Sequence, residues 1–134
     1  MSVIESLDKN MPILIVDDYP TMRKIVKNCL TQLGFKNIEE AENGQSALEK
    51  LKSNEFKFVI ADWHMPNMMG LDLLKAIRAD DSLKELPFLI ITPETRKEKN
   101  IEEAVQAGAS QFIVKPLTKS ALQNKMEAMF NRKG

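Results

Sequence analysis

The chain has 134 residues, the size of one ordinary domain, and its 43% hydrophobic and 28% charged residues are typical of a globular protein. Its 19 Lys and Arg residues balance its 19 Asp and Glu residues, so we expect no nucleic acid or anionic membrane as a partner. The apolar runs are too short to span a bilayer, and the first ten residues lack a signal-peptide core. Because the lone cysteine, Cys29, suits a reducing compartment, we expect a soluble, cytoplasmic protein.

Short apolar runs alternate along the chain with longer segments of helical periodicity. The first run, ILIV at 13–16, is typical of a strand buried on both faces of a parallel sheet. A helical stripe that includes Ile25 follows at 21–33, and Gly34 stands where a helix end favours positive φ. The same alternation predicts strands at 37–41, 58–61, 88–91 and 111–114, and helices at 44–54, 71–79, 101–108 (with Val105 in its stripe) and after Thr118, which caps the last helix.

Five strands that alternate with five helices predict an α/β fold, a doubly wound parallel sheet with helices on both faces. We expect one domain over 12–134, preceded by a tail at 1–11 that is either loose or a short helix. In such sheets ligands bind beyond the carboxyl ends of the strands, so the polar residues there are the candidates for a site.

Charged and polar residues follow four of the predicted strands at that edge. Asp17 and Asp18 end the first strand, Asp62 the third, Thr92 the fourth and Lys115 the fifth. Converging carboxylates repel one another unless a cation lies between them, and oxygen ligands without His or Cys favour Mg²⁺, Mn²⁺ or Ca²⁺ over zinc. A hydroxyl and an ammonium suit phosphoryl oxygens. Each residue alone also has a structural explanation, such as a turn or a surface lysine, but their joint placement indicates phosphoryl transfer.

These residues and their neighbours resemble the receiver domains of bacterial response regulators, and among them the chemotaxis regulators. The resemblance covers the chain after residue 11 and rests, in order, on the strings ILIVDD, TMRKIVKNCL, LGFKNIEEAENG, VIADWHMPNMMGLDLLKAIRAD, QAGAS and VKP. It implies the flavodoxin-like strand order 2-1-3-4-5, which comes from the resemblance alone. It also implies a stand-alone, monomeric receiver that catalyses only its own phosphorylation and dephosphorylation.

The resemblance assigns the phosphorylation site and its metal. Asp62 is expected to accept the phosphoryl group from a histidine kinase or from a small acyl phosphate such as acetyl phosphate. Mg²⁺ is expected to be bound directly by Asp18, Asp62 and the backbone carbonyl of His64, while Asp17 holds metal-bound water.

The resemblance also implies how the signal leaves the site. Thr92 is expected to hydrogen-bond the phosphoryl group, Lys115 to pair with it, and the Lys115-Pro116 bond to be cis. The loop after the fourth strand is then drawn in, and Phe112 can fill the vacated space. The surface formed by the expected fourth helix, fifth strand and fifth helix changes and is read by a partner, which we expect to be the flagellar motor switch protein; a phosphatase is a possible further partner.

Several positions depart from the chemotaxis regulators, near the site or on the output surface. Phe112 stands where tyrosine is usual, Pro93 where a small residue is usual, and Met69 where an acid is common. The segment 95–100 is one residue longer. His64 can influence the water that hydrolyses the acyl phosphate, although an ordinary loop histidine is the simpler interpretation.

These departures leave a second hypothesis open, a phosphate sink that drains a kinase without an output of its own, or a receiver outside chemotaxis with another partner. A hydrolase with an aspartate nucleophile is disfavoured, because 17–19 lacks the two-residue spacing between nucleophile and acid. A flavin-binding domain is disfavoured because the first loop lacks the donors that would cradle a phosphate.

Overall fold

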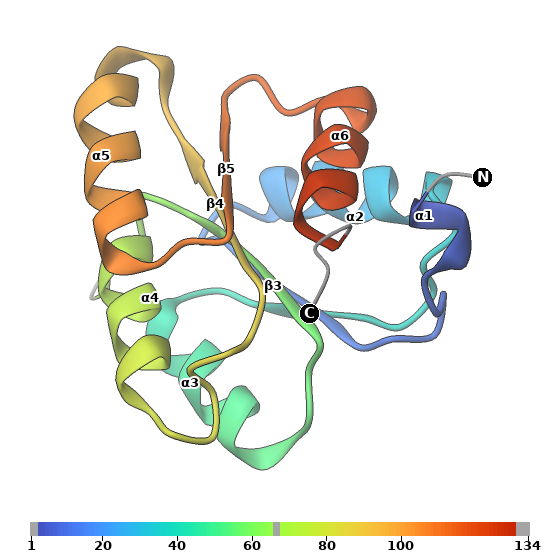
Figure 1. Ribbon diagram of the computed structural model, residues 1–134, viewed down its shortest axis with the longest axis horizontal. Coiled ribbons are helices and arrows are strands. Elements are labelled where there is room, and N and C mark those ends of the chain that lie inside the picture. Colours follow the sequence, from blue (N-terminus) through green and yellow to red (C-terminus); the bar gives the residue numbers. More distant parts are fainter. Residues whose placement is uncertain (1–2, 66–67, 131–134) are drawn as a thin grey trace.

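The computed structural model describes residues 3–65 and 68–130 and has a five-stranded parallel sheet at its centre (Figure 1). The strand order is β2-β1-β3-β4-β5, which confirms the expected order. The strands are β1 (Ile13–Val16), β2 (Ile38–Ala41), β3 (Phe58–Asp62), β4 (Phe88–Thr92) and β5 (Gln111–Val114).

Helices cover both faces of the sheet. In Figure 1, α3, α4 and α5 lie on one side of the strands, and α1, α2 and α6 lie on the other. The helices are α1 (Val3–Ser6), α2 (Pro20–Gln32), α3 (Gly44–Ser53), α4 (Gly70–Ala79), α5 (Lys97–Ala107) and α6 (Lys119–Phe130), with the 3-10 turn η1 (Glu94–Arg96) before α5.

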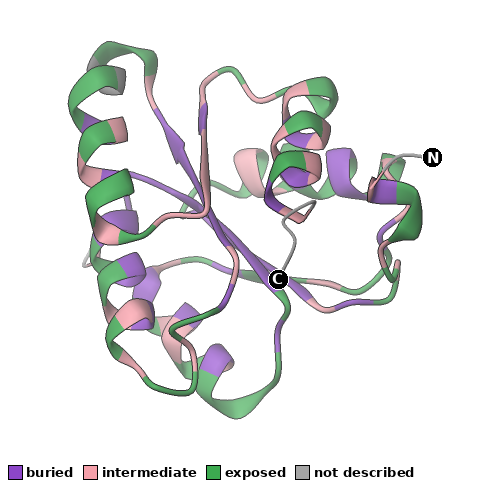
Figure 2. Cartoon of the chain, in the orientation of Figure 1, coloured by how far each residue is buried: buried purple, intermediate pink, exposed green. Residues whose placement is uncertain are grey.

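The three central strands are buried along their whole length, as Figure 2 shows for the middle of the sheet. Alternate side chains of each strand enter the two cores, because successive residues of a strand point to opposite faces. Leu14, Val59 and Ile90, for example, pack under α3, α4 and α5, while Ile15 and Phe58 pack under α2 and α6. The strands are continuous apolar runs because helices cover both faces of the sheet.

The segment before β1 contains a short helix that belongs to the core. Ile4 of α1 and Met11 are both buried in the apolar cluster beneath α2 and α6. The backbone N–H of Lys36 donates to the carbonyl of Lys9 at 2.9 Å, which ties this segment to the loop that leads into β2.

Two residues that were expected on buried helical stripes are exposed, so these predictions were wrong. Ile25 is 40% and Val105 61% exposed. The buried side of α2 runs through Val26 and the residues three and four further on, and the buried side of α5 contains Asn100 and Ala104. Each misplaced residue is adjacent in sequence to a buried one, and one residue is a rotation of about 100° around a helix.

The local signals at the ends of elements behave as expected. Thr118 Oγ1 accepts from the backbone N–H of Ala121 at 3.0 Å, Gly34 has φ of 105°, and the Lys115-Pro116 bond is cis. None of the helices among residues 3–65 and 68–130 is long and apolar enough to cross a membrane.

Two helices begin at glycines whose surroundings differ in rigidity. A Cβ on Gly70 would lie 2.2 Å from the backbone carbonyl oxygen of Asp62, and the Gly70 N–H donates to the Trp63 carbonyl at 2.9 Å. A Cβ on Gly44 would instead meet the Met68 side chain, with Sδ at 2.7 Å, Cγ at 2.8 Å and Cβ at 2.9 Å. The start of α4 is therefore packed directly against the backbone that carries Asp62.

We predict that Gly70→Ala lowers the free energy of unfolding by about 2 to 4 kcal/mol, because the clash is with backbone that cannot rotate away. Gly44→Ala is the matched control, also at the first residue of a helix. Its cost should be about half as large or less, since most of the methionine side chain can turn away, its Cβ needs only a small shift and alanine favours the helix. Urea unfolding followed by the fluorescence of Trp63 measures both, and equal costs would contradict the prediction.

Candidate functional site

Asp17 and Asp62 lie side by side at the carboxyl ends of the neighbouring strands β1 and β3. Val16 and Ala61 are partners in the β1–β3 register. Asp17 and Asp62 each directly follow one of these partners, so they are neighbours as well. The side chains are buried, with Asp17 2% and Asp62 6% exposed, whereas Asp18 is exposed. One carboxylate oxygen from each of these three residues lies within 4.8 Å of the others. The structure thus brings together the three acids that the sequence placed at two strand ends.

Burial makes this cluster electrostatically unfavourable. Loss of solvent raises the pKa of Asp17 from its usual value of 3.8 to about 6, and the negative charges of Asp62 and Asp18 add to the rise, while the Tyr19 amide and Lys115 oppose it. Loss of solvent also raises the pKa of Asp62, against the opposing effect of Lys115. A further positive partner would therefore stabilise the ionised form of both carboxylates.

One oxygen of the cluster points to the nature of that partner. Asp17 Oδ1 accepts from the Tyr19 N–H at 2.9 Å, but within the described part of the chain Asp17 Oδ2 is buried without a hydrogen-bond partner. A buried, unpaired carboxylate oxygen is costly unless a cation or an ordered water meets it. Three carboxylates without a His or Cys ligand in the group form a hard-oxygen set, which fits Mg²⁺.

Lys115 reaches the cluster from the end of β5. Its Nζ lies 3.3 Å from Asp62 Oδ1, and its backbone N–H donates to the Thr92 carbonyl at 2.9 Å. The backbone bond continues the pairing of Thr92 with Val114 and so places the lysine beside the end of β4. The cation, the hydroxyl residue and Asp62 are therefore held by three adjacent strands.

Thr92 has a buried partner that the sequence analysis did not identify. The side-chain Nδ2 of Asn100 donates to Thr92 Oγ1 at 2.7 Å, and the two side chains are 2% and 1% exposed. Asn100 lies in the first half of α5, four residues before the buried Ala104. Its signal in the sequence was a polar residue at a position of the helix where an apolar one would be expected.

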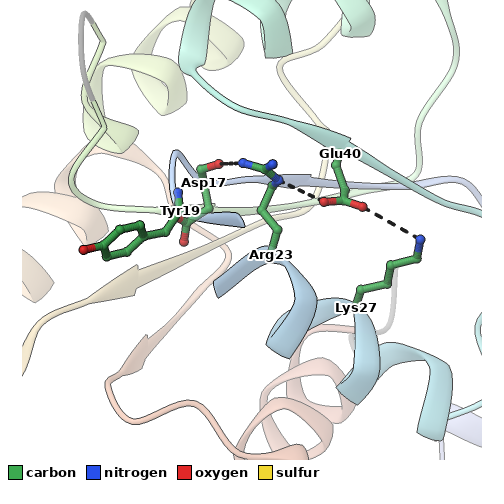
Figure 3. A network of polar contacts seen from close by, with 5 residues as sticks. All are labelled: Asp17, Tyr19, Arg23, Lys27 and Glu40. Carbon is green, nitrogen blue, oxygen red and sulfur yellow. Dashed lines mark hydrogen bonds and ion pairs between the residues drawn. The ribbon is translucent and has the colours of Figure 1, made fainter. Parts of the chain in front are cut away.

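A second contact that the sequence did not reveal fixes the backbone at Asp17. The Arg23 guanidinium donates to the Asp17 carbonyl at 2.7 Å and to Glu40 Oε1 at 2.9 Å, and Lys27 Nζ lies 3.8 Å from the other Glu40 oxygen (Figure 3). In this view the Tyr19 ring points away from the network. Because Arg23 binds the carbonyl of Asp17 and the carboxylate of Glu40, it orients the end of β1 without pairing with the Asp17 carboxylate.

The remaining predicted residues lie around the cluster. His64 is exposed and lines a cleft of about 330 Å³ together with Trp63, Met69 and Asn100. Phe112 is half-buried on β5, and Lys125 Nζ of α6 lies 4.5 Å from the centre of its ring. The structure does not bring Phe112 into the acid cluster, and it leaves the roles of His64 and Phe112 as predictions.

Comparison with known proteins gives the same family from sequence and from structure. The family model described as the response regulator receiver domain matches residues 13–127. The chemotaxis protein CheY-3 of Vibrio cholerae is 56% identical over 126 residues, which are 94% of this chain and 96% of that protein. The chemotaxis protein CheY of Pseudomonas aeruginosa is 51% identical over 122 residues, which are 91% and 98% of the two chains.

Solved structures share the fold. The chemotaxis response regulator CheY4 of Vibrio cholerae superposes with a TM-score of 0.81 at 32% identity, over 90% of this chain and 98% of that one. A putative response regulator from Chloroflexus aurantiacus gives a TM-score of 0.84 at 27% identity, over 92% and 99% of the two chains.

The raised pKa of Asp17 predicts a pH-dependent stability in the absence of divalent cations. Since the folded pKa of about 6 exceeds the ordinary value of 3.8, the folded chain binds more protons than the unfolded chain between these values. Stability from this group is therefore complete below about pH 4 and is lost as the pH rises through about 6. Asn cannot ionise, so Asp17→Asn removes this loss. From pH 4 to pH 7 the free energy of unfolding of the variant should rise by about 2 kcal/mol relative to that of the native chain.

Urea unfolding in EDTA at several pH values from 4 to 7 measures this difference. Asp81→Asn, at an exposed acid far along the chain, is the control and should track the native chain at every pH. A difference between Asp17→Asn and the native chain that does not change with pH would show that the buried acid is not the cause.

Proposed function

The chain belongs to the response regulator receiver family, and on that premise we propose that Asp62 accepts a phosphoryl group from a histidine kinase of a chemotaxis phosphorelay. The phosphorylated form then signals by a changed surface on α5, β5 and α6. The protein acts on no separate substrate, because its chemistry is confined to its own phosphorylation and dephosphorylation. The observation that carries the proposal is the contact of Lys115 with Asp62, beside the buried Asp17 carboxylate, whose Oδ2 has no hydrogen-bond partner in the described part of the chain.

The site supports each part of this chemistry with a residue of its own. A carboxylate oxygen of Asp62 forms the new P–O bond, and the imidazole of the donor phosphohistidine departs with the electron pair of the bond that breaks. The Lys115 ammonium is placed to balance the charge of the phosphoryl oxygens, and the Thr92 hydroxyl is placed at the next strand end to donate to one of them. Positioning and electrostatics are the main contributions that a protein makes to this reaction.

Mg²⁺ fits the same site. The carboxylates of Asp17, Asp18 and Asp62 converge there. With the backbone carbonyl of His64, which the family resemblance adds, they are the groups proposed to hold the ion, Asp17 through metal-bound water. When bound, the ion would neutralise charge on the carboxylates and on the incoming phosphoryl oxygens. Burial raises the pKa of both Asp17 and Asp62 in spite of the nearby Lys115, and this cost of burying the two charges supports a requirement for the ion.

The proposed output is binding to the flagellar motor switch protein. Support comes from the relatives, which are named as chemotaxis proteins and cover more than nine tenths of this chain. The surface in question carries an exposed apolar residue, Val105 of α5, and the half-buried Phe112 beneath Lys125. Exposed apolar side chains and aromatic rings are the groups that commonly anchor a partner segment.

We predict that incubation with acetyl phosphate and Mg²⁺ adds the mass of one phosphoryl group to the native chain. Asp62→Asn keeps the size of the side chain but removes the nucleophilic oxygen, so it should gain nothing. Intact-mass spectrometry, with and without Mg²⁺, measures both. If the native chain gained no mass while it stayed folded, and a histidine-kinase donor also failed, the proposed phosphorylation would be refuted.

Binding to a motor switch protein distinguishes a signalling receiver from a phosphate sink. We predict that phosphorylation increases the affinity at least about tenfold and that Val105→Asp removes most of this gain, because it places a charge in an apolar contact. Ser53→Asp adds the same charge at the exposed end of α3 and is the matched control. Calorimetric titration with a trapped phosphorylated form measures the affinities, and no gain on phosphorylation would favour the phosphate sink.

A further inference from the structure

Four polar or charged side chains are buried among the residues whose burial the structure describes, and all belong to one neighbourhood: Asp17, Asp62, Thr92 and Asn100. The function proposed above uses the first three. We propose that Asn100 is a positioning residue, which sets the Thr92 hydroxyl as a donor for the phosphoryl group and transmits the movement of Thr92 to α5. The inference rests on the proposed phosphorylation of Asp62 and specifies how that event reaches the output helix.

The direction of the hydrogen bond determines what Thr92 can do. Asn100 Nδ2 is a donor only, so at 2.7 Å from Thr92 Oγ1 it occupies an acceptor site of the hydroxyl. The hydroxyl hydrogen must then turn away from Asn100 and is left to donate to another acceptor. An accepted hydrogen bond also polarises a hydroxyl and strengthens it as a donor. Thr92 is thereby prepared for an anionic oxygen before any phosphoryl group arrives.

The burial of the pair makes the link mechanical. If Thr92 turns or shifts towards a phosphoryl group, the buried amide of Asn100 either follows it or loses its partner, which is unfavourable in a site removed from water. Following requires a movement of the first turns of α5, where Asn100 lies. Asn100 is also one of the residues that line the 330 Å³ cleft beside Trp63 and His64.

The two ends of α5 are held differently. Just beyond its C-terminal end, the Gly108 carbonyl accepts from Arg78 Nε at 2.9 Å, and Arg78 also donates to the Leu86 carbonyl at 2.7 Å. Those bonds tie that end to α4 and to the start of β4, far from the strand ends that carry the site. The Asn100 end is bonded to the site itself. A displacement at Thr92 would therefore tilt α5 about its anchored end.

Pro93 gives this side-chain link added importance. It directly follows Thr92, has a fixed φ and restricts the conformation of the residue before it. The backbone after Thr92 is consequently stiff, where the sequence analysis expected a loop that is drawn in. The bond between Asn100 and Thr92 offers a route to α5 that does not depend on bending this backbone.

The test is a double-mutant cycle on the rate of phosphorylation by acetyl phosphate with Mg²⁺, followed by intact mass. Asn100→Leu removes the donor at similar size and should slow the native chain roughly three- to tenfold, the effect of one hydrogen bond. In a Thr92→Val background the same substitution should change the rate less than about twofold, because the hydroxyl it acts on is gone. Gln106→Leu replaces an exposed amide of the same helix and is the matched control, expected to leave the rate unchanged.

Hydrogen exchange of the α5 amides provides the second readout. Phosphorylation should alter exchange over 98–107 in the native chain, and by less than half as much in phosphorylated Asn100→Leu. If Asn100→Leu does not fold by circular dichroism, Asn100→Asp, of the same shape but without the donor amide, takes its place in both measurements. An equal slowing in both Thr92 backgrounds, or a native α5 response in the variant, would overturn this inference alone. A native chain that is never phosphorylated would overturn the proposed function together with it.

Discussion

Two carboxylates buried next to each other at the ends of β1 and β3 set the conditions for the rest of this molecule. Buried carboxylates lose their hydration, and like charges close together repel one another. Both effects raise the pKa values of Asp17 and Asp62. A fold built only for stability would avoid this arrangement, since it contributes nothing to packing. The presence of this pair at the ends of β1 and β3 is explained by what it can bind, a hard cation and a phosphoryl group.

The surrounding contacts hold the acids in place without neutralising them. Arg23 binds the Asp17 carbonyl and the Glu40 carboxylate, so its charge is paired with an acid outside the cluster. Lys115 Nζ lies 3.3 Å from Asp62 Oδ1. Gly70 leaves room for α4 to begin against the Asp62 backbone. The site is thus rigid in its backbone and short of positive charge, which is the state that favours capture of Mg²⁺ and phosphate.

The same neighbourhood joins chemistry to shape. Thr92 ends a buried strand and shares a hydrogen bond with a helix on the surface, so an event at the strand ends has a direct contact with α5. Buried polar pairs of this kind are unfavourable when half satisfied, and that property makes them suitable as links between two arrangements. Val105 is exposed on α5 and Phe112 is half-buried on β5, so both lie on the elements of the proposed output surface.

Much of the fold and of the candidate site followed from the sequence alone. Continuous apolar runs and helical stripes predicted the α/β sheet, and the position of Asp17, Asp62, Thr92 and Lys115 directly after strands placed them on one edge, because all strands of a parallel sheet end there. Thr118 and Gly34 followed from local backbone chemistry. The exposure of Val105, the burial of Ile4, the bond from Arg23 to Asp17 and the pairing of Asn100 with Thr92 were decided only by the tertiary structure. Those features depend on how each helix is rotated against the sheet, because a rotation by one residue changes which side chain is buried. The residues at the strand ends stay on the same edge of the sheet whatever the rotation of the helices.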